Sequence, residues 1–325
     1  MVPEDSHLAR RGRKEGFEIW PVEYKSKFHL ASWKNIIEGF RQLQPDVVNT
    51  HSSEDSWMAG AAARLLRVPL VVRTRHVLAP IASSFSYRFP HTILACSEAI
   101  RDGLVDQGVP YRKIIVQPTG IDEQRFRFSQ EKRNQIREKY GIGRDDILVG
   151  NVGFFRIYKG QVFIIRTAAR MPEHYKFMLV GDGQDRPILE EEMRKQGVAD
   201  KFILVGHQEN PEDFISAFDI LFFASWSTEG IAQSYIQCLL YGMPLLVCRT
   251  PSMLEPLQYV QKYEVIDYED LEGAQKGLQK LSENLVRDEE QVERQRSALA
   301  QKYGLNAMIE NLLQVYSEHG ITAEK

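Results

Sequence analysis

The chain has 325 residues, enough for two domains of ordinary size, and its 43% apolar and 26% charged residues are typical of a folded protein. Its net charge of −3 argues against a general affinity for nucleic-acid phosphates. No apolar run approaches the roughly 18–20 residues that cross a bilayer, and the polar first residues do not resemble a secretory signal. The three cysteines are far apart, which argues against a disulfide framework or a zinc site, so we expect a cytoplasmic protein.

Short apolar runs alternate with longer amphipathic stretches along the chain. The runs that we expect as strands are 45–50, 69–74, 91–97, 113–118, 146–153, 176–183, 201–206, 219–224 and 244–248. Helical patterns fall between them, for example at 33–43, 55–66, 97–108 and 161–171. Continuous apolar strands that alternate with helices predict α/β domains with parallel sheets covered on both faces.

A charged stretch at 128–146 separates the two sets of strands and carries the glycines Gly141 and Gly143. We therefore expect a domain boundary near 141–145, with a first domain at 1–143 and a second at 144–304. The remaining segment, 305–325, has apolar residues at helical spacing. We expect it to form a C-terminal helix that packs back toward the first domain.

The strand expected at 146–153 leads through a glycine-bearing loop into a helix that starts near Gly160. Free backbone N–H groups and the helix dipole make such a helix start favourable for an anion. Arg156 and Lys159 add two positive charges beside it. The pattern predicts a phosphate site, and the alternative is that both side chains are solvated loop residues.

A second segment runs from the strand at 219–224 through a loop and a helix to the strand at 244–248. Glu229 lies in the loop, and Gln233 and Gln237 follow at spacings of four and eight, so all three can share one side of the helix. Open α/β sheets bind ligands at this carboxyl edge. The alternative is an exposed polar stripe with an acidic residue in the first helical turn.

Taken in chain order, these motifs resemble the retaining glycosyltransferases of family 4. The matching residues are PTGIDEQRF at 118–126, Arg156, Lys159 and Gly160, LVGDG at 179–183, VGH at 205–207, Glu229, Gly230 and Gln237, and Gly242 and Pro244. The resemblance covers about residues 40–318. It implies the GT-B fold, in which two Rossmann-like, doubly wound parallel-sheet domains face a cleft.

The resemblance also implies that the second domain binds a nucleotide-sugar donor and the first an acceptor. Glu229 would lie against the donor sugar as a catalytic residue. Gln237 stands where the family usually has a second Glu for the ribose hydroxyls, and its amide still hydrogen-bonds a hydroxyl, though less strongly. The implied donor-binding residues are Gly153, Arg156, Lys159, Gly160, Gly230, Gln233, Ser234 and Gln237.

Two histidines are candidates in the first domain. His76 follows the strand at 69–74, where similar enzymes place a catalytic histidine near the donor sugar, and the alternative is a structural histidine. His51 ends the strand at 45–50 and is a candidate for binding acceptor hydroxyls. In the polar run that follows it, we expect Ser53 to cap the next helix.

The resemblance implies transfer with retention of the anomeric configuration by front-face attack, in which a phosphate oxygen takes the acceptor proton. Arg156, Lys159 and the helix starts would stabilise the departing diphosphate. No convincing DxD motif is present, so we expect no metal and no cofactor, and the UDP- or GDP-linked sugar is a substrate. The expected reaction moves a hexose to a saccharide or lipid-linked acceptor in surface polysaccharide or lipopolysaccharide biosynthesis.

The same resemblance implies a place in the cytoplasm or at the inner membrane face. The basic residues Arg10, Arg11, Arg13 and Lys14 leave open a weak peripheral contact with anionic lipid, against an ordinary solvated segment. Family members normally begin with a strand, a glycine-rich loop and a helix. Here residues 15–24 look like a later strand, so we expect a first domain that lacks this unit.

Three other functions are compatible with parts of the pattern. A degenerate protein that binds nucleotide sugars with little or no transfer would account for Gln237 and for the short first domain. A sugar-nucleotide epimerase shares the fold, but its typical His and Asp/Glu set is not evident. A Rossmann dehydrogenase is disfavoured because no GxGxxG motif follows the first strand.

Overall fold

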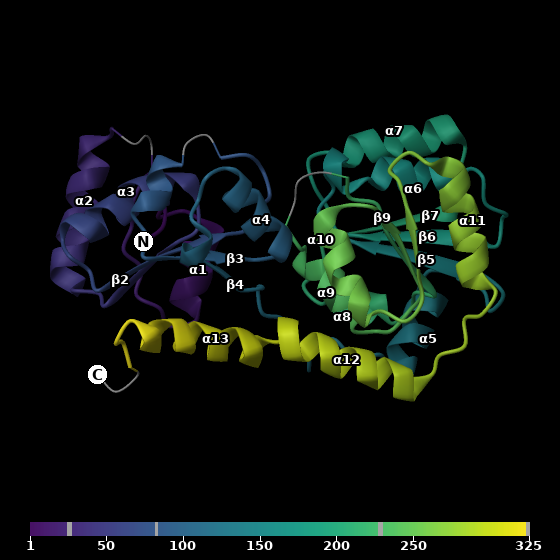
Figure 1. Ribbon diagram of the computed structural model, residues 1–325. Helices are drawn as coiled ribbons and strands as arrows, with labels where there is room; N and C mark the ends of the chain where they lie inside the picture. Colours follow the sequence, from purple (N-terminus) through teal and green to yellow (C-terminus); the bar gives the residue numbers. More distant parts are fainter. Residues whose placement is uncertain (25–27, 82–83, 227–229, 323–325) are drawn as a thin grey trace. The chain divides into compact units, whose positions relative to one another are not determined.

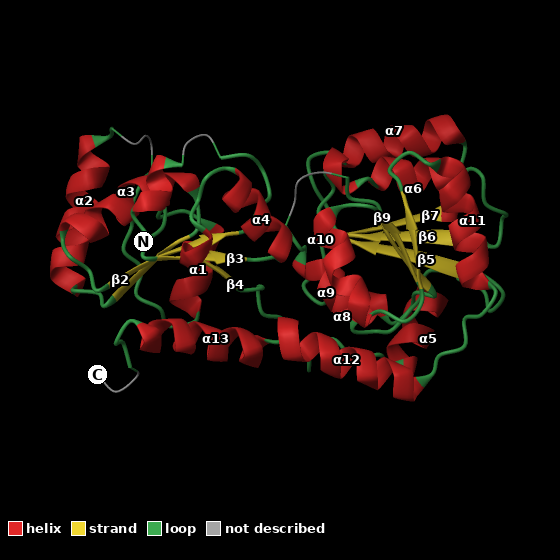
Figure 2. Cartoon of the chain, in the orientation of Figure 1, coloured by secondary structure: helices red, strands yellow, loops and turns green. Residues whose placement is uncertain are grey.

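The structure is a computed structural model that describes residues 1–24, 28–81, 84–226 and 230–322 (Figure 1). The chain divides into two compact units. The first unit comprises Met1–Gln117 and Glu310–Lys325, and the second comprises Pro118–Ile309. Each unit has its own parallel sheet between layers of helices, drawn in yellow and red in Figure 2.

The first unit contains a four-stranded parallel sheet in the sequential order β1-β2-β3-β4. Its strands are β1 (Val47–Thr50), β2 (Leu70–Arg75), β3 (Thr92–Ala95) and β4 (Ile114–Val116). One face is covered by α2 (Leu30–Leu43), α3 (Ser53–Leu65) and α4 (Glu98–Asp106). Leu70, Val72 and Leu94 on the other face pack against Val315 of the C-terminal helix α13 (Leu305–Glu318).

The second unit contains a six-stranded parallel sheet in the order β10-β9-β8-β5-β6-β7. Its strands are β5 (Ile147–Val152), β6 (Tyr175–Val180), β7 (Phe202–Gly206), β8 (Ile220–Phe223), β9 (Leu245–Cys248) and β10 (Tyr263–Ile266). The chain adds β6 and β7 on one side of β5 and then returns to place β8 on the other. The sheet therefore changes its winding direction between β5 and β8, and such switch points are where α/β sheets bind ligands.

Helices cover both faces of this second sheet because alternate strand residues point to opposite sides. The first face packs against α5 (Gln130–Lys139), α8 (Pro211–Ile215), α9 (Gln233–Leu239) and α12 (Glu289–Tyr303). The second packs against α6 (Gln161–Ala168) and α11 (Leu271–Ser282), and α7 (Arg186–Gln196) packs on α6. The short helices are α10 (Pro251–Leu254) and 3-10 turns at Phe85–Arg88, Tyr111–Lys113, Ile157–Lys159, Ala199–Lys201 and Glu255–Tyr259.

All nine predicted strands are confirmed, and β10 is an additional strand that the sequence analysis missed. The strand predicted at 15–24 is wrong, because the structure has only an isolated bridge between Val2 and Pro21 there. The bridge is made by Trp20 and Val22, and Pro21, which lacks a backbone N–H, cannot donate to a further strand on its other side. Ahead of it lies α1 (His7–Lys14), where Arg11 pairs with Glu15.

The charged stretch at 128–146 holds the helix α5, and the boundary expected at 143/144 falls inside the second unit, between α5 and β5. Two arginines of α5 converge on the buried carboxylate of Asp219, at the start of β8. Arg133 donates to one carboxylate oxygen, and Arg137 donates to the other over 2.9 Å. These charged residues of the stretch thus help to hold α5 on the sheet.

Candidate functional site

A pocket of about 410 Å³ opens at the carboxyl edge of the second sheet. It is lined by residues at the ends of β5, β6 and β7 and by the first turn of α9, next to the switch point between β5 and β8. The volume falls in the usual range for small-molecule sites of about 300–1,000 Å³. We call this space the switch-point pocket.

Glycines allow the backbone segments around this pocket to approach closely. At Gly181, φ is +144°, and a Cβ atom there would lie 1.9 Å from the carbonyl oxygen of Gly153. At Gly160, φ is +76°, and a Cβ atom would lie 2.0 Å from the carbonyl oxygen of Ala224. The indole N–H of Trp226 also donates to the carbonyl of Ile157 over 3.1 Å, so the loops after β5 and β8 are held together.

Replacing Gly160 with alanine is expected to lower the free energy of unfolding by at least about 2 kcal/mol, because the new Cβ combines positive φ with a backbone collision. The matched control is Gly141→Ala, where φ is +65° and nothing lies within 4 Å. That variant should cost only about 1 kcal/mol, for the left-handed conformation alone. Chemical denaturation of both variants checks the difference, and equal losses would contradict the close approach of the two loops.

The structure brings five of the predicted donor residues together around the switch-point pocket: Gly153, Lys159, Gln233, Ser234 and Gln237. Arg156, Gly160 and Gly230 are not among its lining residues. Gly160 lies behind the loop as the N-cap of α6, and Arg156 is half-buried at the start of the 3-10 turn. Glu229 lies outside the described residues, so its role stays a prediction.

Four polar or aromatic lining residues were not named as site residues in the sequence analysis: Phe154, Gln208, and Asp182 and His207 of the motifs at 179–183 and 205–207. Each follows the end of β5, β6 or β7 by one or two positions, and this shared position is the signal that identifies them. Phe154 is 69% exposed, whereas its neighbour Phe155 is fully buried, so the pocket receives the aromatic ring directly after Gly153.

The charges that line the described part of the switch-point pocket are few. Lys159 is a half-buried cation, and Asp182 is an acid. One carboxylate oxygen of Asp182 accepts the N–H of Gly183 over 2.8 Å, and the other lies 3.5 Å from the guanidinium of Arg186. Arg186, which also pairs with Glu190 over 2.8 Å, offsets part of the negative charge of Asp182 next to Lys159.

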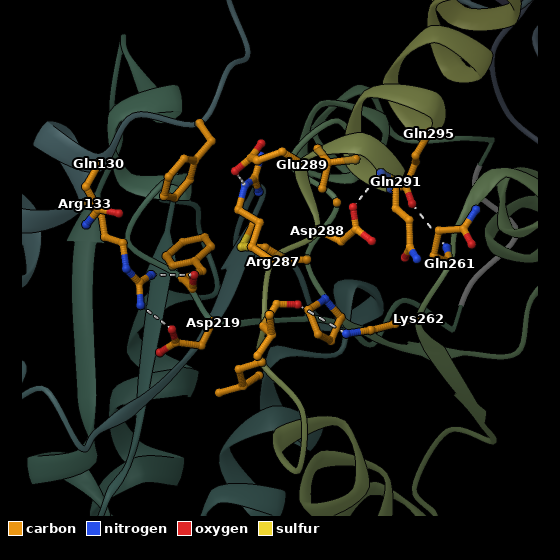
Figure 3. Close-up of a pocket in the computed structure, with 18 residues that line it drawn as sticks. Gln130, Arg133, Asp219, Gln261, Lys262, Arg287, Asp288, Glu289, Gln291 and Gln295 are labelled. Carbon is orange, nitrogen blue, oxygen red and sulfur yellow. Dashed lines mark hydrogen bonds and ion pairs between the residues drawn. The ribbon is translucent and has the colours of Figure 1, made fainter.

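A second pocket of about 340 Å³ lies at the amino edge of the same sheet (Figure 3). Its cations already have partners. Arg133 is paired with Asp219, Arg287 with Glu289, and Lys262 donates to two backbone carbonyls. A diphosphate would have to break these interactions. We call this second space the amino-edge pocket.

In the first unit, His51 and His76 lie side by side. Nδ1 of His51 is 3.0 Å from Nε2 of His76, and the rings stack with centroids 5.3 Å apart. Nδ1 of His76 also lies 3.2 Å from the sulfur of Cys96, which the sequence analysis missed. The structure thus brings both predicted histidines together.

The cap of α3 differs from the expectation. Ser52, not Ser53, is the N-cap residue, because its hydroxyl accepts the N–H of Asp55 and the Asp55 carboxylate accepts the N–H of Ser52 in return. The second oxygen of Asp55 accepts the backbone N–H of His51 over 2.9 Å. The capping box therefore also fixes the main chain of His51.

Three histidines of the first unit favour the neutral form. Desolvation lowers the pKa of His51, His76 and His91 below the ordinary value of 6.5, and the charges of Arg75 near His76 and of Arg64 near His91 act in the same direction. Asp55 partly offsets the shift at His51 and His76. The unfolded chain therefore binds more protons than the native one just below pH 6.5.

The stability of the first unit is accordingly expected to fall as the pH drops from 7.5 through 6.5 to 5.5. Thermal unfolding followed at these pH values measures the slope. In the variant His51→Asn/His76→Asn the slope should be reduced, since two of the three groups are gone. If the stability of that variant depended on pH as steeply as that of the wild type, the assignment of the pKa shifts to His51 and His76 would be contradicted.

Among the described residues, no helix has both the length and the apolar character that a membrane span requires. The basic residues of α1 are partly engaged on the surface, since Arg11 pairs with Glu15 and Arg13 with Glu4.

Comparisons with curated proteins find glycosyltransferases. Putative glycosyltransferase EpsF of Bacillus subtilis is 25% identical over 201 residues, which cover 61% of this chain and 50% of EpsF. An Escherichia coli enzyme named UDP-Gal:alpha-D-GlcNAc-diphosphoundecaprenol alpha-1,3-galactosyltransferase is 24% identical, covering 67% of this chain and 62% of the enzyme. The chain thus spans only half to less than two thirds of the length of these relatives.

Solved structures show the same fold. Anabaena Alr3699/HepE in complex with UDP superposes with a TM-score of 0.85 at 14% identity, covering 97% of this chain and 90% of HepE. A glycosyltransferase from Rickettsia africae gives a TM-score of 0.87 at 18% identity, covering 98% of this chain and 89% of that enzyme. With two parallel-sheet units, of four and six strands, the predicted GT-B fold is confirmed.

Two family profiles match consecutive parts of the sequence. Glycosyltransferase Family 4 matches residues 2–125, and Glycosyl transferases group 1 matches residues 132–301, which is more than half of the chain. The second match contains the whole switch-point pocket. The chain therefore belongs to the group 1 glycosyltransferases.

Proposed function

We propose that the protein transfers a hexose from a UDP- or GDP-linked sugar to a saccharide or lipid-linked acceptor, with retention of the anomeric configuration and without a metal. The observation that carries the proposal is the switch-point pocket, where Lys159, Ser234 and Gln237 meet at the carboxyl edge of the sheet. HepE was solved with UDP and with UDP-glucose, which supports a nucleotide-sugar donor.

In the proposed complex, the diphosphate lies beside Lys159 and the hydroxyl of Ser234. The amide of Gln237 hydrogen-bonds the ribose hydroxyls, and Asp182, His207 and Gln208 remain for the base. The space beside Gly153 is open for this arrangement. A Cβ atom built at that position would have only the Ser234 side-chain oxygen near it, 3.9 Å away. Glu229 and Gly230 are proposed to contact the sugar from the loop before α9.

In the proposed reaction, the bond from the anomeric carbon to the phosphate oxygen breaks, and the acceptor oxygen bonds to the same face of that carbon. The acceptor hydroxyl proton passes to a phosphate oxygen of the leaving diphosphate, so no protein nucleophile is needed. Negative charge grows on the diphosphate as the bond breaks. Lys159, with Arg156 as the second proposed cation, would stabilise this charge electrostatically.

The names of the relatives support a role in cell-surface glycan assembly. The Escherichia coli enzyme acts on a diphosphoundecaprenol acceptor by its name, and another relative is the lipopolysaccharide core biosynthesis glycosyltransferase LpsE of Rhizobium meliloti. We therefore propose a lipid-linked or saccharide acceptor in polysaccharide or lipopolysaccharide biosynthesis, in the cytoplasm or at the inner membrane face.

The proposal is tested by incubating the protein with UDP and GDP sugars and a lipid-linked saccharide acceptor, with and without a chelator. Proton NMR of the product reads the anomeric configuration directly. We expect the donor's configuration in the product and the same rate with the chelator present. An inverted product would contradict retention, and loss of transfer on chelation would contradict metal-free chemistry.

The alternative of a degenerate nucleotide-sugar-binding protein predicts a different outcome. Calorimetry would then show that a nucleotide sugar binds, while neither transfer nor donor hydrolysis is detected with any acceptor. Gln237, which stands in place of the family's second Glu, is the residue on which this alternative rests. Restoring the carboxylate with Gln237→Glu should then strengthen nucleotide binding without producing transfer.

A further inference from the structure

Three chemically active side chains follow the ends of three neighbouring strands in the first unit. His51 comes directly after β1, His76 directly after β2, and Cys96 directly after β3. Since parallel strands end at one edge of a sheet, these residues meet there although the sequence separates them by 20 residues or more. We call the three residues the strand-end chain.

Both ring nitrogens of His76 are engaged within the strand-end chain. Nε2 lies 3.0 Å from Nδ1 of His51, and Nδ1 lies 3.2 Å from the sulfur of Cys96. An imidazole has only these two nitrogens for hydrogen bonding. His76 therefore cannot offer a ring nitrogen to a ligand unless its contact with His51 or with Cys96 is broken.

His51 is placed differently. Its backbone N–H donates to Asp55, which holds the main chain, and its ring Nδ1 faces His76. Its Nε2 has no partner among the residues that the structure describes, and the side chain is exposed. Among the ring nitrogens of the strand-end chain, Nε2 of His51 is thus the one that is open to a ligand.

We propose that the strand-end chain works as one unit in which Nε2 of His51 binds a hydroxyl of the sugar acceptor, while His76 and Cys96 are positioning residues. This inference rests on the proposed function. It keeps the acceptor-binding role expected for His51 and replaces the catalytic role expected for His76 with a positioning role. His76 orients His51, and Cys96 orients His76.

A hydroxyl is the ligand group that fits this chain in either proton arrangement. If the Cys96 thiol donates to His76, then His76 donates to His51, and Nε2–H of His51 is a donor. If His51 donates to His76 and His76 to the sulfur, Nε2 is an acceptor. A hydroxyl both donates and accepts, so it matches both arrangements, whereas a carboxylate or an ammonium group matches only one.

The charge state of the chain favours a neutral ligand near pH 7. The two imidazoles repel each other when charged, and Arg75 opposes a further positive charge on His76, while Asp55 favours one. Desolvation is the main reason that the pKa of both rings lies below 6.5, and the repulsion between charges adds to it at His76. On acidification the pair should take up one proton first, and the resulting positive charge is shared by the two rings through the hydrogen bond between them.

The first experiment measures KM for the acceptor and for the donor separately. His51→Ala should raise the acceptor KM by about tenfold, the loss expected for one hydrogen bond, and leave the donor KM within twofold. His76→Ala should act in the same direction, because it releases the His51 ring. The control His7→Ala changes an exposed histidine of α1 and should alter neither value.

Cys96 is tested with a matched pair. Cys96→Ser keeps a group that can donate and accept, so it should retain the wild-type acceptor KM within about twofold. Cys96→Ala removes the partner of His76 and should raise the acceptor KM. If both variants behave alike, Cys96 only fills space and its positioning role is overturned.

A second readout needs no turnover. Nitrogen-15 NMR of the histidine side chains reports which nitrogen of each ring carries the proton. His76→Ala and Cys96→Ala should both change the signals and the titration midpoint of His51, although Cys96 does not touch it. Unchanged His51 signals in both variants would overturn the proposal that the strand-end chain works as one unit. Should no donor or acceptor support transfer, the proposed function fails, and the NMR measurement still decides whether the chain exists.

Discussion

Replacing Lys159 with alanine is expected to lower the turnover number for sugar transfer by about 10²–10³-fold, the usual cost of removing one group that stabilises developing negative charge. Lys159 is the cation among the described residues that line the switch-point pocket, and it is half-buried. Partial burial strengthens its attraction for a diphosphate relative to a fully solvated lysine. Steady-state kinetics with the best donor measures the effect.

The matched control is Lys195→Ala, which removes an exposed lysine from α7 and should leave turnover unchanged. Arg156→Ala and Glu229→Ala complete the series, since both residues are proposed to act on the donor. Arg156 does not line the pocket. The loss of turnover in Arg156→Ala, compared with the loss in Lys159→Ala, therefore decides whether both cations reach the diphosphate. Turnover like that of the wild type in Lys159→Ala would contradict the site.

The largest effect on stability is expected from Asp219→Ala, at about 3–5 kcal/mol, because this change leaves two largely buried guanidinium groups without their counter-charge. The side chains of Asp219 and Arg137 are only 10% and 11% exposed. One Asp219 oxygen also accepts the backbone N–H of Leu148 over 2.7 Å, so the change loosens β5 as well. Urea denaturation of the second unit measures the loss.

Asp213 provides the control for this prediction. It pairs with Lys132 of the same helix α5 over 3.1 Å, but both side chains are about one third or more exposed. An exposed pair of this kind contributes about 1 kcal/mol or less. If Asp219→Ala costs no more than Asp213→Ala, the two arginines are not held as the structure shows.

The strands could be predicted because their apolar runs end at clear turn residues, but two segments depended on contacts that the sequence does not display. The charged residues of 128–146 favour a solvated linker, yet Arg133 and Arg137 find Asp219 more than 80 positions away and fix α5 on the sheet. Residues 15–24 have the composition of a strand, but they pair only through an isolated bridge between Pro21 and Val2.

The candidate site was predictable where a motif carries the residue. Lys159, Gln233, Ser234 and Gln237 do line one pocket. Phe154 was missed because an aromatic residue after an apolar strand looks like core, and only the alternation of the chain shows that Phe155 is buried and Phe154 exposed. Cys96 was missed because its role depends on which strands are neighbours, a property of the sheet order.

A crystal structure of the protein with UDP or GDP tests the account most directly. We predict that the diphosphate lies in the switch-point pocket within hydrogen-bonding distance of Lys159, with the ribose next to Gln237. A nucleotide bound in the amino-edge pocket, or one whose phosphates lie away from Lys159, would contradict the account.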